Sequence, residues 1–199
     1  MNRSLSLAVL AAGAAICCRA QGGRPNVLVL LVDDMQTKSI HAFGGQAITP
    51  NIDGLIAQGT AFTRCFTNGS LGGALSMPSR AMIMTGRHIF EIESNGATIP
   101  SAHTTMPEYF RSLGYATFGT GKWHSDKSSF WRSFGCGDNI FMGGMLQYEN
   151  GGQVTPHLRH FDPTGKYSAK PFVGNEFSSQ MFADAAITFL DSIRGTGKP

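Results

Sequence analysis

One apolar segment near the start constrains the fold of this 199-residue chain more than any other. Residues 26–32 read Asn-Val-Leu-Val-Leu-Leu-Val, and two carboxylates, Asp33 and Asp34, follow directly. A continuous aliphatic and β-branched run without polar alternation is typical of a strand buried on both faces of a parallel sheet. Parallel strands need crossover connections, which are usually helices. The segment therefore predicts an α/β fold.

The rest of the chain alternates between helical and extended patterns. Proline or threonine at the start and glycine at the end favour short helices, and amphipathic spacing favours a last, longer one. The alternation predicts a mostly parallel sheet flanked by helices. We expect helices at 50–57 (closed by Gly59), 78–84 (stopped by Gly86), 105–113 (ended by Gly114) and 178–193, further strands at 61–66 and 115–119, and an extended surface loop region over 143–174.

The first 20 residues differ from the remainder. Arg3 precedes an apolar run over 5–17, and small residues flank Arg19 at the end of the segment. This pattern predicts a secretory signal peptide, too short to span a membrane. We therefore expect an exported protein, periplasmic or secreted. Lipidation at Cys17 or Cys18 is the alternative, although the preceding residues fit a lipidation site poorly.

Composition indicates one globular domain over 21–199, because 42% of the residues are hydrophobic. Without residues 1–20 the basic residues fall from 16 to 14 against 13 acidic ones, so the net charge falls from +3 to +1. No basic stripe indicates a nucleic-acid partner. Cys65 and Cys136 remain, and they can pair in an oxidising compartment or stay free.

The end of the chain is an unusual place for a domain boundary. Residues 195–199 follow the last expected helix before any closing strand. We therefore expect a truncated gene, a fragment or the first part of a longer protein, with a sheet that is incomplete.

Asp33 and Asp34 are candidate metal ligands. In α/β proteins ligands bind beyond the carboxyl ends of strands, and adjacent carboxylates repel each other unless a cation joins them. Hard cations such as Ca²⁺ and Mg²⁺ bind several such oxygens. A polar cap that ends the strand is the alternative interpretation of the pair.

Ser76 is a candidate nucleophile and anion site. It precedes an expected helix whose Pro78 suits the first turn, so free N–H groups and the positive end of the helix dipole face it. Arg80 is close enough in sequence to hydrogen-bond an anion there. The alternatives are an ordinary helix cap for Ser76 and a solvated side chain for Arg80.

Lys122 and His124 are further candidates for binding an anion. They lie in Gly-Thr-Gly-Lys-Trp-His, which follows the expected strand at 115–119 and fails the phosphate-loop pattern. Lys122 offers a point charge with three donors, and His124 can donate to an ester oxygen. A surface turn with a buried Trp123 is the alternative.

Four ordered segments resemble the sulfatase family of the alkaline-phosphatase superfamily. They are Arg-Pro-Asn-Val with the following Asp-Asp, Thr-Pro-Asn-Ile-Asp at 49–53, Ser-Met-Pro-Ser-Arg at 76–80 leading to Thr-Gly-Arg, and Gly-Lys-Trp-His at 121–124. The resemblance covers nearly all of residues 21–199 and implies the N-terminal part of an alkaline-phosphatase-like domain.

The resemblance implies hydrolysis of a sulfate ester, by default in a sulfated glycan. Ser76 would be oxidised to formylglycine by a maturase, of the radical type for serine versions, and the hydrated aldehyde would attack sulfur. Lys122, His124 and Arg80 would contact the transferring group, and Lys122 and His124 would bind the substrate. Asp33, Asp34 and Ser76 would hold a divalent cation, usually Ca²⁺ with Mg²⁺ possible.

Two departures from the family pattern shape the expectation. Position 76 is Ser rather than the commoner Cys, and the family's later cation ligands have no counterpart here, so we expect weak cation binding and little activity from this chain alone.

Two other functions stay open. One is a phosphoester hydrolase or transferase that uses unmodified Ser76, and the other is a non-catalytic exported glycan-binding protein.

Overall fold

The computed structural model describes residues 23–73, 75–146 and 151–199. The described chain divides into two units, residues 23–30 with Pro199 and residues 31–198. The predicted signal peptide, residues 1–20, lies outside the described residues. Within the described part, no helix is both long and apolar enough to cross a bilayer.

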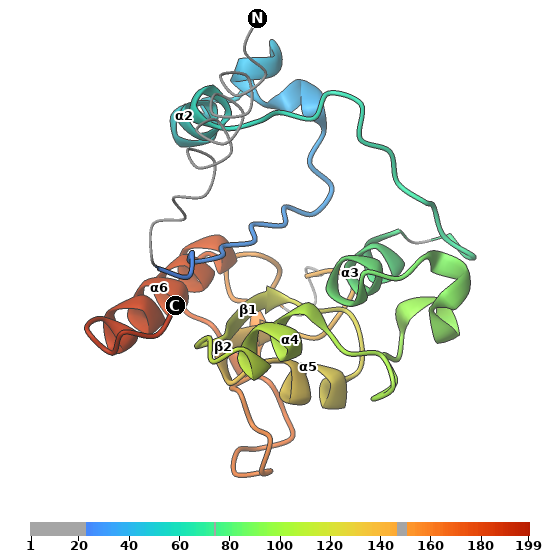
Figure 1. Ribbon diagram of the computed structural model, residues 1–199, viewed down its shortest axis with the longest axis vertical. Helices are drawn as coiled ribbons and strands as arrows, with labels where there is room; N and C mark the ends of the chain where they lie inside the picture. The colour runs from blue at the N-terminus through green and yellow to red at the C-terminus, as the bar shows by residue number, and fades with distance from the viewer. Residues whose placement is uncertain (1–22, 74, 147–150) are drawn as a thin grey trace, which may run out of the picture. The chain divides into compact units, whose positions relative to one another are not determined.

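Unit 31–198 contains helices and two small sheets (Figure 1). The two strand pairs differ in direction, since β1 and β2 are parallel whereas β3 and β4 are antiparallel. The α-helices are α2 (Pro50–Gln58), α3 (Ser76–Thr85), α4 (Met106–Ser112), α5 (Lys127–Ser133) and α6 (Ser178–Ile193); the strands are β1 (Phe118–Lys122), β2 (Cys136–Phe141), β3 (His157–Leu158) and β4 (Phe172–Val173); the 3₁₀ turns are η1 (Thr37–Ser39), η2 (His41–Phe43), η3 (Ile89–Glu91) and η4 (Glu93–Gly96).

The parallel pair β1–β2 is connected through α5, which makes it a crossover unit. Helices cover β1 on both sides. The ring of Phe118 stacks on Phe189 of α6 at 4.8 Å between ring centroids. A side chain at Gly119 would instead come within 2.8 Å of Phe130 and Phe134, both at α5. The layering of helix, parallel strands and helix confirms the α/β class predicted from the sequence.

The core lies between α5, β2 and the segment that follows β1. Trp123, Phe130 and Phe134 form its centre, with Trp123 and Phe130 edge to face at 5.2 Å. Ile140 of β2 is fully buried against them. Because Trp123 follows the last residue of β1, this packing fixes the strand end where the candidate site begins.

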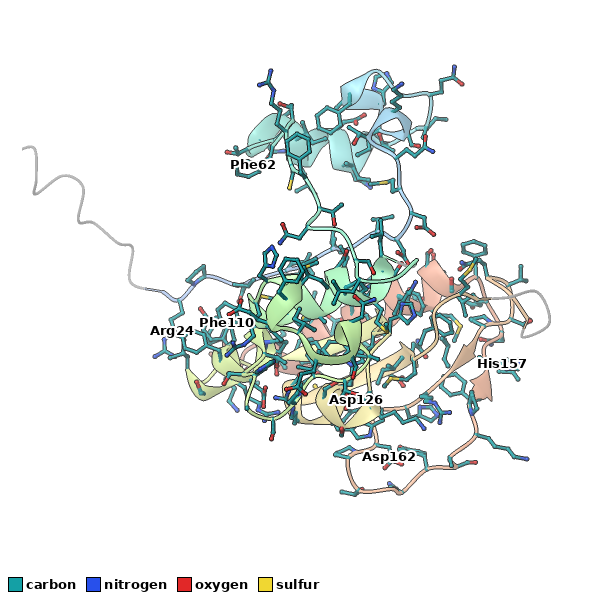
Figure 2. The ribbon with its side chains drawn as sticks, turned by 90° about the vertical axis from the view of Figure 1, so that its right-hand side faces the viewer. Arg24, Phe62, Phe110, Asp126, His157 and Asp162 are labelled. Atoms are coloured by element: carbon teal, nitrogen blue, oxygen red, sulfur yellow. The ribbon has the colours of Figure 1, made fainter. Side chains whose placement is uncertain are left out.

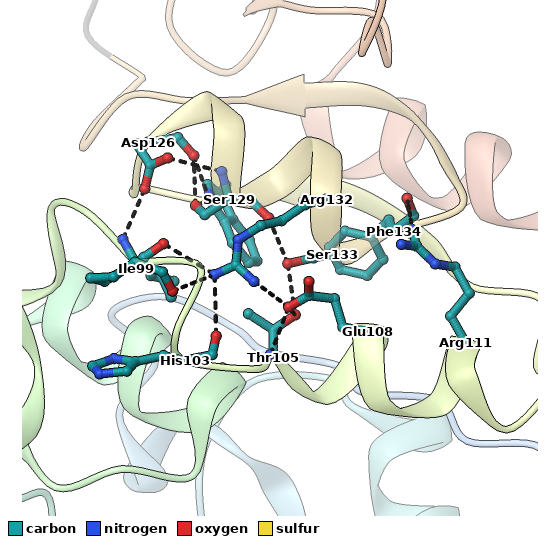
Figure 3. Close-up of polar contacts among 12 residues, drawn as sticks. Ile99, His103, Thr105, Glu108, Arg111, Asp126, Ser129, Arg132, Ser133 and Phe134 are labelled. Atoms are coloured by element: carbon teal, nitrogen blue, oxygen red, sulfur yellow. Dashed lines mark hydrogen bonds and ion pairs between the residues drawn. The ribbon is translucent and has the colours of Figure 1, made fainter.

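A polar network around Arg132 joins α4, α5 and the loop before α4 (Figure 3). Arg132 forms an ion pair with Glu108, which also accepts a hydrogen bond of 2.9 Å from the backbone N–H of Thr105. The second guanidinium nitrogen of Arg132 donates to the backbone carbonyls of Ile99, Pro100 and His103. These contacts satisfy partly buried carbonyl groups of a loop that has no sheet partners.

Four predicted helices are confirmed. α2 begins at Pro50 and ends just before Gly59. α3 ends just before Gly86, whose φ of 66° is the left-handed conformation that favours glycine at a helix end. α4 begins after Thr105, which forms a capping box with Glu108. The last helix, α6, has the predicted bounds.

Two predicted strands are wrong within this structure. Residues 26–32 form no strand, and the side chains of Val27 to Val32 are between 40% and 76% exposed. Residues 61–66 also form no strand, and Phe62 is 81% exposed (Figure 2). A parallel strand forms only beside a neighbour that supplies its ladder, and none of the described strands pairs with either segment.

The strand predicted at 115–119 lies a few residues later, as β1 over Phe118–Lys122. The reason is the end of α4, where the N–H of Tyr115 bonds back to the carbonyl of Phe110. The region 143–174 is largely irregular as predicted, apart from the two-residue strands β3 and β4. Cys65 and Cys136 are free thiols.

Candidate active site

Ser76 is the first residue of α3, and its side chain does not cap the helix. Leu75 occupies the cap position without a side-chain hydrogen bond. The Ser76 hydroxyl instead donates a hydrogen bond of 2.8 Å to Oδ1 of Asp33. The ordinary cap that the sequence left open is therefore not its role, and its oxygen lies where the N-terminus of α3 favours negative charge.

Asp33 joins three segments of the chain. Its second oxygen, Oδ2, forms an ion pair with Nζ of Lys122 at the end of β1. The guanidinium of Arg80 lies 3.8 Å from the same oxygen. One carboxylate thus holds together the hydroxyl and two cations that the sequence indicated separately.

Arg80 is buried within α3, with only 8% of its surface exposed. One of its terminal nitrogens donates to the backbone carbonyl of Lys122 at 2.9 Å, which ties α3 to β1. Its Nε atom is buried and has no partner among the described residues. Since buried polar atoms are nearly always hydrogen-bonded, this donor is suited to an anionic ligand.

His124 follows the strand end in a strained backbone conformation. Its φ of 68° lies in the left-handed region, which is uncommon for residues other than glycine and concentrates at functional sites. Trp123 anchors this turn, because its Nε1 donates to Ser129 at 3.1 Å. The Nδ1 atom of His124 is buried without a partner in the described part of the chain. Trp123 is buried as the alternative interpretation expected, but the turn also carries two site residues.

The charges of the site shift its pKa values. Desolvation opposes ionisation of Asp33, but hydrogen bonds from Lys122 and Ser76 and the charges of Lys122 and Arg80 hold its pKa below the ordinary value. Burial lowers the pKa of His124, and the charges of Lys122 and Arg80 lower it further against the effect of Asp33. The site therefore favours an ionised Asp33 and a neutral His124 near neutral pH.

Asp34 is not brought into this cluster. Its backbone φ is 54°, and no hydrogen bond or ion pair in the described part of the chain joins its side chain to Ser76. Within the same part, no group of three or more His, Cys, Asp or Glu side chains lies together as a metal site would require. The oxygen donors of Asp33, Asp34 and Ser76 are the type that a hard cation prefers, but they supply only part of its usual six to eight ligands.

Sequence reasoning missed one contributor to the site. A side chain at Gly144 would lie 2.8 Å from Nε2 of His124, so this glycine backbone packs against the imidazole. The only signal was a pair of adjacent glycines, Gly143 and Gly144, inside the region predicted to be loop.

An α/β layer that presents a hydroxyl, a carboxylate and two cations beside a helix N-terminus is suited to binding an anion. The sulfatase family model matches residues 25–199, so the chain belongs to the sulfatase family. Proteins of this family have the alkaline-phosphatase-like α/β fold, which confirms the fold predicted from the sequence.

Curated relatives agree with this family. The chain is 31% identical to an N-acetylglucosamine-6-O-sulfatase of Bacteroides thetaiotaomicron over all of its own length. It is 33% identical to an arylsulfatase of Klebsiella aerogenes over 53% of its length, and 32% identical to an N-acetylgalactosamine-6-O-sulfatase of B. thetaiotaomicron over 51%. The matches cover 34%, 25% and 20% of these relatives, so the chain spans about a third of their lengths at most.

Proposed function

We propose that this chain carries the nucleophile and anion-binding part of a sulfuric ester hydrolase that acts on a sulfated glycan. The observation that supports it most is the contact of Ser76 with Asp33 beside Lys122 and Arg80. Two relatives are named for 6-O-sulfated amino sugars, which supports a glycan as the substrate class.

We propose that Ser76 is converted to formylglycine. A radical-type maturase would remove two electrons and two protons from the serine side chain, which leaves an aldehyde. As a hydrate, this group offers one hydroxyl that attacks sulfur and a second whose deprotonation re-forms the aldehyde and expels sulfate. The net reaction is R–O–SO₃⁻ with water giving R–OH and hydrogen sulfate.

The remaining residues have distinct proposed roles. The ammonium of Lys122 and the guanidinium of Arg80 stabilise the charge of the sulfate group, and the unpartnered Nε of Arg80 is the donor that remains free for it. His124, held neutral, donates a hydrogen bond to the ester oxygen through Nδ1. Asp33 orients the side chain at position 76.

Asp33, Asp34 and Ser76 are the residues that would hold a divalent cation, Ca²⁺ or Mg²⁺. Such an ion would supply positive charge near the sulfate group.

Sulfate release tests this function. The chain, produced with a serine-specific maturase, is incubated with an aryl sulfate and with N-acetylglucosamine 6-sulfate in the presence of Ca²⁺. We expect slow turnover from this chain alone, which Ser76→Ala abolishes and Lys122→Ala lowers by about 10²- to 10³-fold. Lys38→Ala, which removes an exposed lysine elsewhere, is the matched control and should leave the rate unchanged. Hydrolysis of a phosphate ester by the unmatured Ser76 form, with no sulfate release by the matured form, would contradict the proposal.

Export is also proposed, on the pattern of residues 1–20. N-terminal sequencing of the exported protein should begin near Gln21. Recovery of Met1 from extracytoplasmic protein would contradict it.

A further inference from the structure

A second hollow shares no residue with the candidate active site. It has a volume of about 460 Å³ and lies between α5 and the loop over residues 159–172. This volume falls within the range of small-molecule sites, about 300–1,000 Å³. Its lining is unusual because it combines aromatic rings with cations. The lining includes the cations Lys127, Arg159 and Lys170 and the rings of Trp131, Tyr167 and Phe172.

The aromatic rings of this hollow are held in place. His160 lies against Phe172 at 4.4 Å and against Tyr167 at 4.6 Å between ring centroids. The Nδ1 atom of His160 is in turn 3.0 Å from Oδ1 of Asp138 on β2. Tyr167 is still 48% exposed. A fixed and exposed ring is a preordered apolar surface, and binding to it costs little conformational entropy.

The loop that bears Tyr167 is fixed by Asp162 (Figure 2). The two oxygens of Asp162 accept hydrogen bonds from the backbone N–H groups of Lys166, at 2.7 Å, and Tyr167, at 3.0 Å. In the described part of the chain, Asp162 is the one carboxylate on the wall of the hollow. These N–H groups favour the ionised form of Asp162, so the wall carries three cations against this one carboxylate.

Three cations line the hollow, namely Lys127, Arg159 and Lys170. Over the described residues, none of the three forms an ion pair with a carboxylate. Arg159 is half-buried, and one of its terminal nitrogens donates to the carbonyl of Ala169, which holds the guanidinium in place. The surplus positive charge favours an anionic ligand.

We propose that this hollow binds a sulfated saccharide, with a sugar ring against Tyr167 and sulfate groups on Arg159 and the two lysines. The apolar C–H face of a sugar suits an aromatic ring, and a fixed guanidinium suits the oxygens of a sulfate group. A free inorganic anion would use the cations only, and a neutral sugar would use the rings only. The choice of sulfate as the anion rests on the proposed function, whereas the location rests on the hollow itself.

Binding measured by calorimetry tests the proposal. The 199-residue chain carries Ser76→Ala, so that neither maturation nor turnover enters the result. The probes are a sulfated heparin-type tetrasaccharide, its desulfated counterpart and inorganic sulfate. We expect the sulfated probe to bind at least about tenfold more tightly than either of the others, since only it engages rings and cations together.

Two pairs of substitutions locate the site. Lys127→Ala with Lys170→Ala removes two exposed cations of the hollow and should weaken binding of the sulfated probe about tenfold or more. Lys38→Ala with Lys198→Ala removes the same charge elsewhere and should change binding by less than about twofold. The proposal would be overturned by an equal loss of affinity for the sulfated probe in both pairs. It would also be overturned if the desulfated probe or inorganic sulfate bound as tightly, or if the sulfated probe did not bind at all. These outcomes are independent of sulfate release, so the failure of this site and of the proposed function can be distinguished.

Discussion

The hydroxyl of Ser76 donates a 2.8 Å hydrogen bond to Asp33, although 43 positions separate the two residues in the chain. The other oxygen of Asp33 is paired with Lys122, which lies 89 positions away. The same carboxylate therefore positions the helix start and the strand end. The ion pair with Lys122 needs the ionised state of Asp33, which makes the site sensitive to pH.

In Asp33→Asn, the melting temperature should depend less on pH at acid pH than it does in the wild type. The pKa of Asp33 in the folded chain lies below its ordinary value, so the unfolded chain binds the proton more tightly. The resulting stabilisation is present above the unfolded pKa and is lost as the pH falls through the folded pKa. We expect the melting temperature of the wild type to fall more steeply than that of the variant between about pH 5 and pH 3.

Glu176→Gln is the matched control, because Glu176 is an exposed carboxylate away from the site. The melting temperature of this control should change with pH as that of the wild type does. If the melting temperatures of the wild type and of Asp33→Asn fall equally steeply as the pH is lowered, Asp33 is not held in its charged state.

His124 should titrate below the value of free histidine, about 6.5. Burial lowers its pKa first, and the charges of Lys122 and Arg80 add to that effect. Lys122→Met removes one of those charges and should raise the titration midpoint of His124, measured by NMR of the ring protons. Lys127→Met, which removes a lysine outside this cluster, should leave the midpoint where it is. An unchanged midpoint in Lys122→Met would contradict the close approach of the two side chains.

Gly96→Ala should destabilise the packing of η4 against α3. Gly96 has a φ of 85°, and a Cβ atom there would lie 2.8 Å from Cβ of Ala81 and 3.1 Å from the carbonyl oxygen of Met77. Gly165→Ala is the matched control, because its φ is 73° with nothing within 4 Å. We expect Gly96→Ala to lower the free energy of unfolding by about 1–3 kcal/mol more than Gly165→Ala, since only the first adds a steric clash. Equal losses in urea unfolding would show that backbone strain alone matters.

The described α-helices other than α5 were predictable because their signals are local. Pro50 and Gly59 delimit α2, and Thr105 with Glu108 forms a capping box within one turn of α4. The strands were less predictable, because a strand depends on a partner elsewhere in the chain, and only β1 was predicted, a few residues too early. The apolar run at 26–32 was predicted to be buried, yet its side chains are exposed in this structure. α5 and β2 were not predicted, since short polar and glycine-containing segments carry little periodicity.

The candidate site was predictable in its residue types but not in its contacts. Motif spacing selected Ser76, Arg80 and Lys122, and the structure brings all three to Asp33. No sequence pattern indicated that the guanidinium of Arg80 would bind the carbonyl of Lys122, or that Asp34 would stay outside the cluster. Such contacts depend on tertiary packing, which a one-dimensional pattern does not contain.

The most direct test of the central claim is the chemical state of residue 76. The chain is produced with a serine-specific maturase, beside a known serine-type sulfatase as a positive control, and the peptide that contains position 76 is analysed by mass spectrometry. We predict that this peptide has lost two hydrogen atoms and reacts with a hydrazide probe, whereas Arg132→Lys, which keeps the signature intact, is modified to the same extent. An unmodified serine at position 76, with the control sulfatase fully converted, would contradict the account.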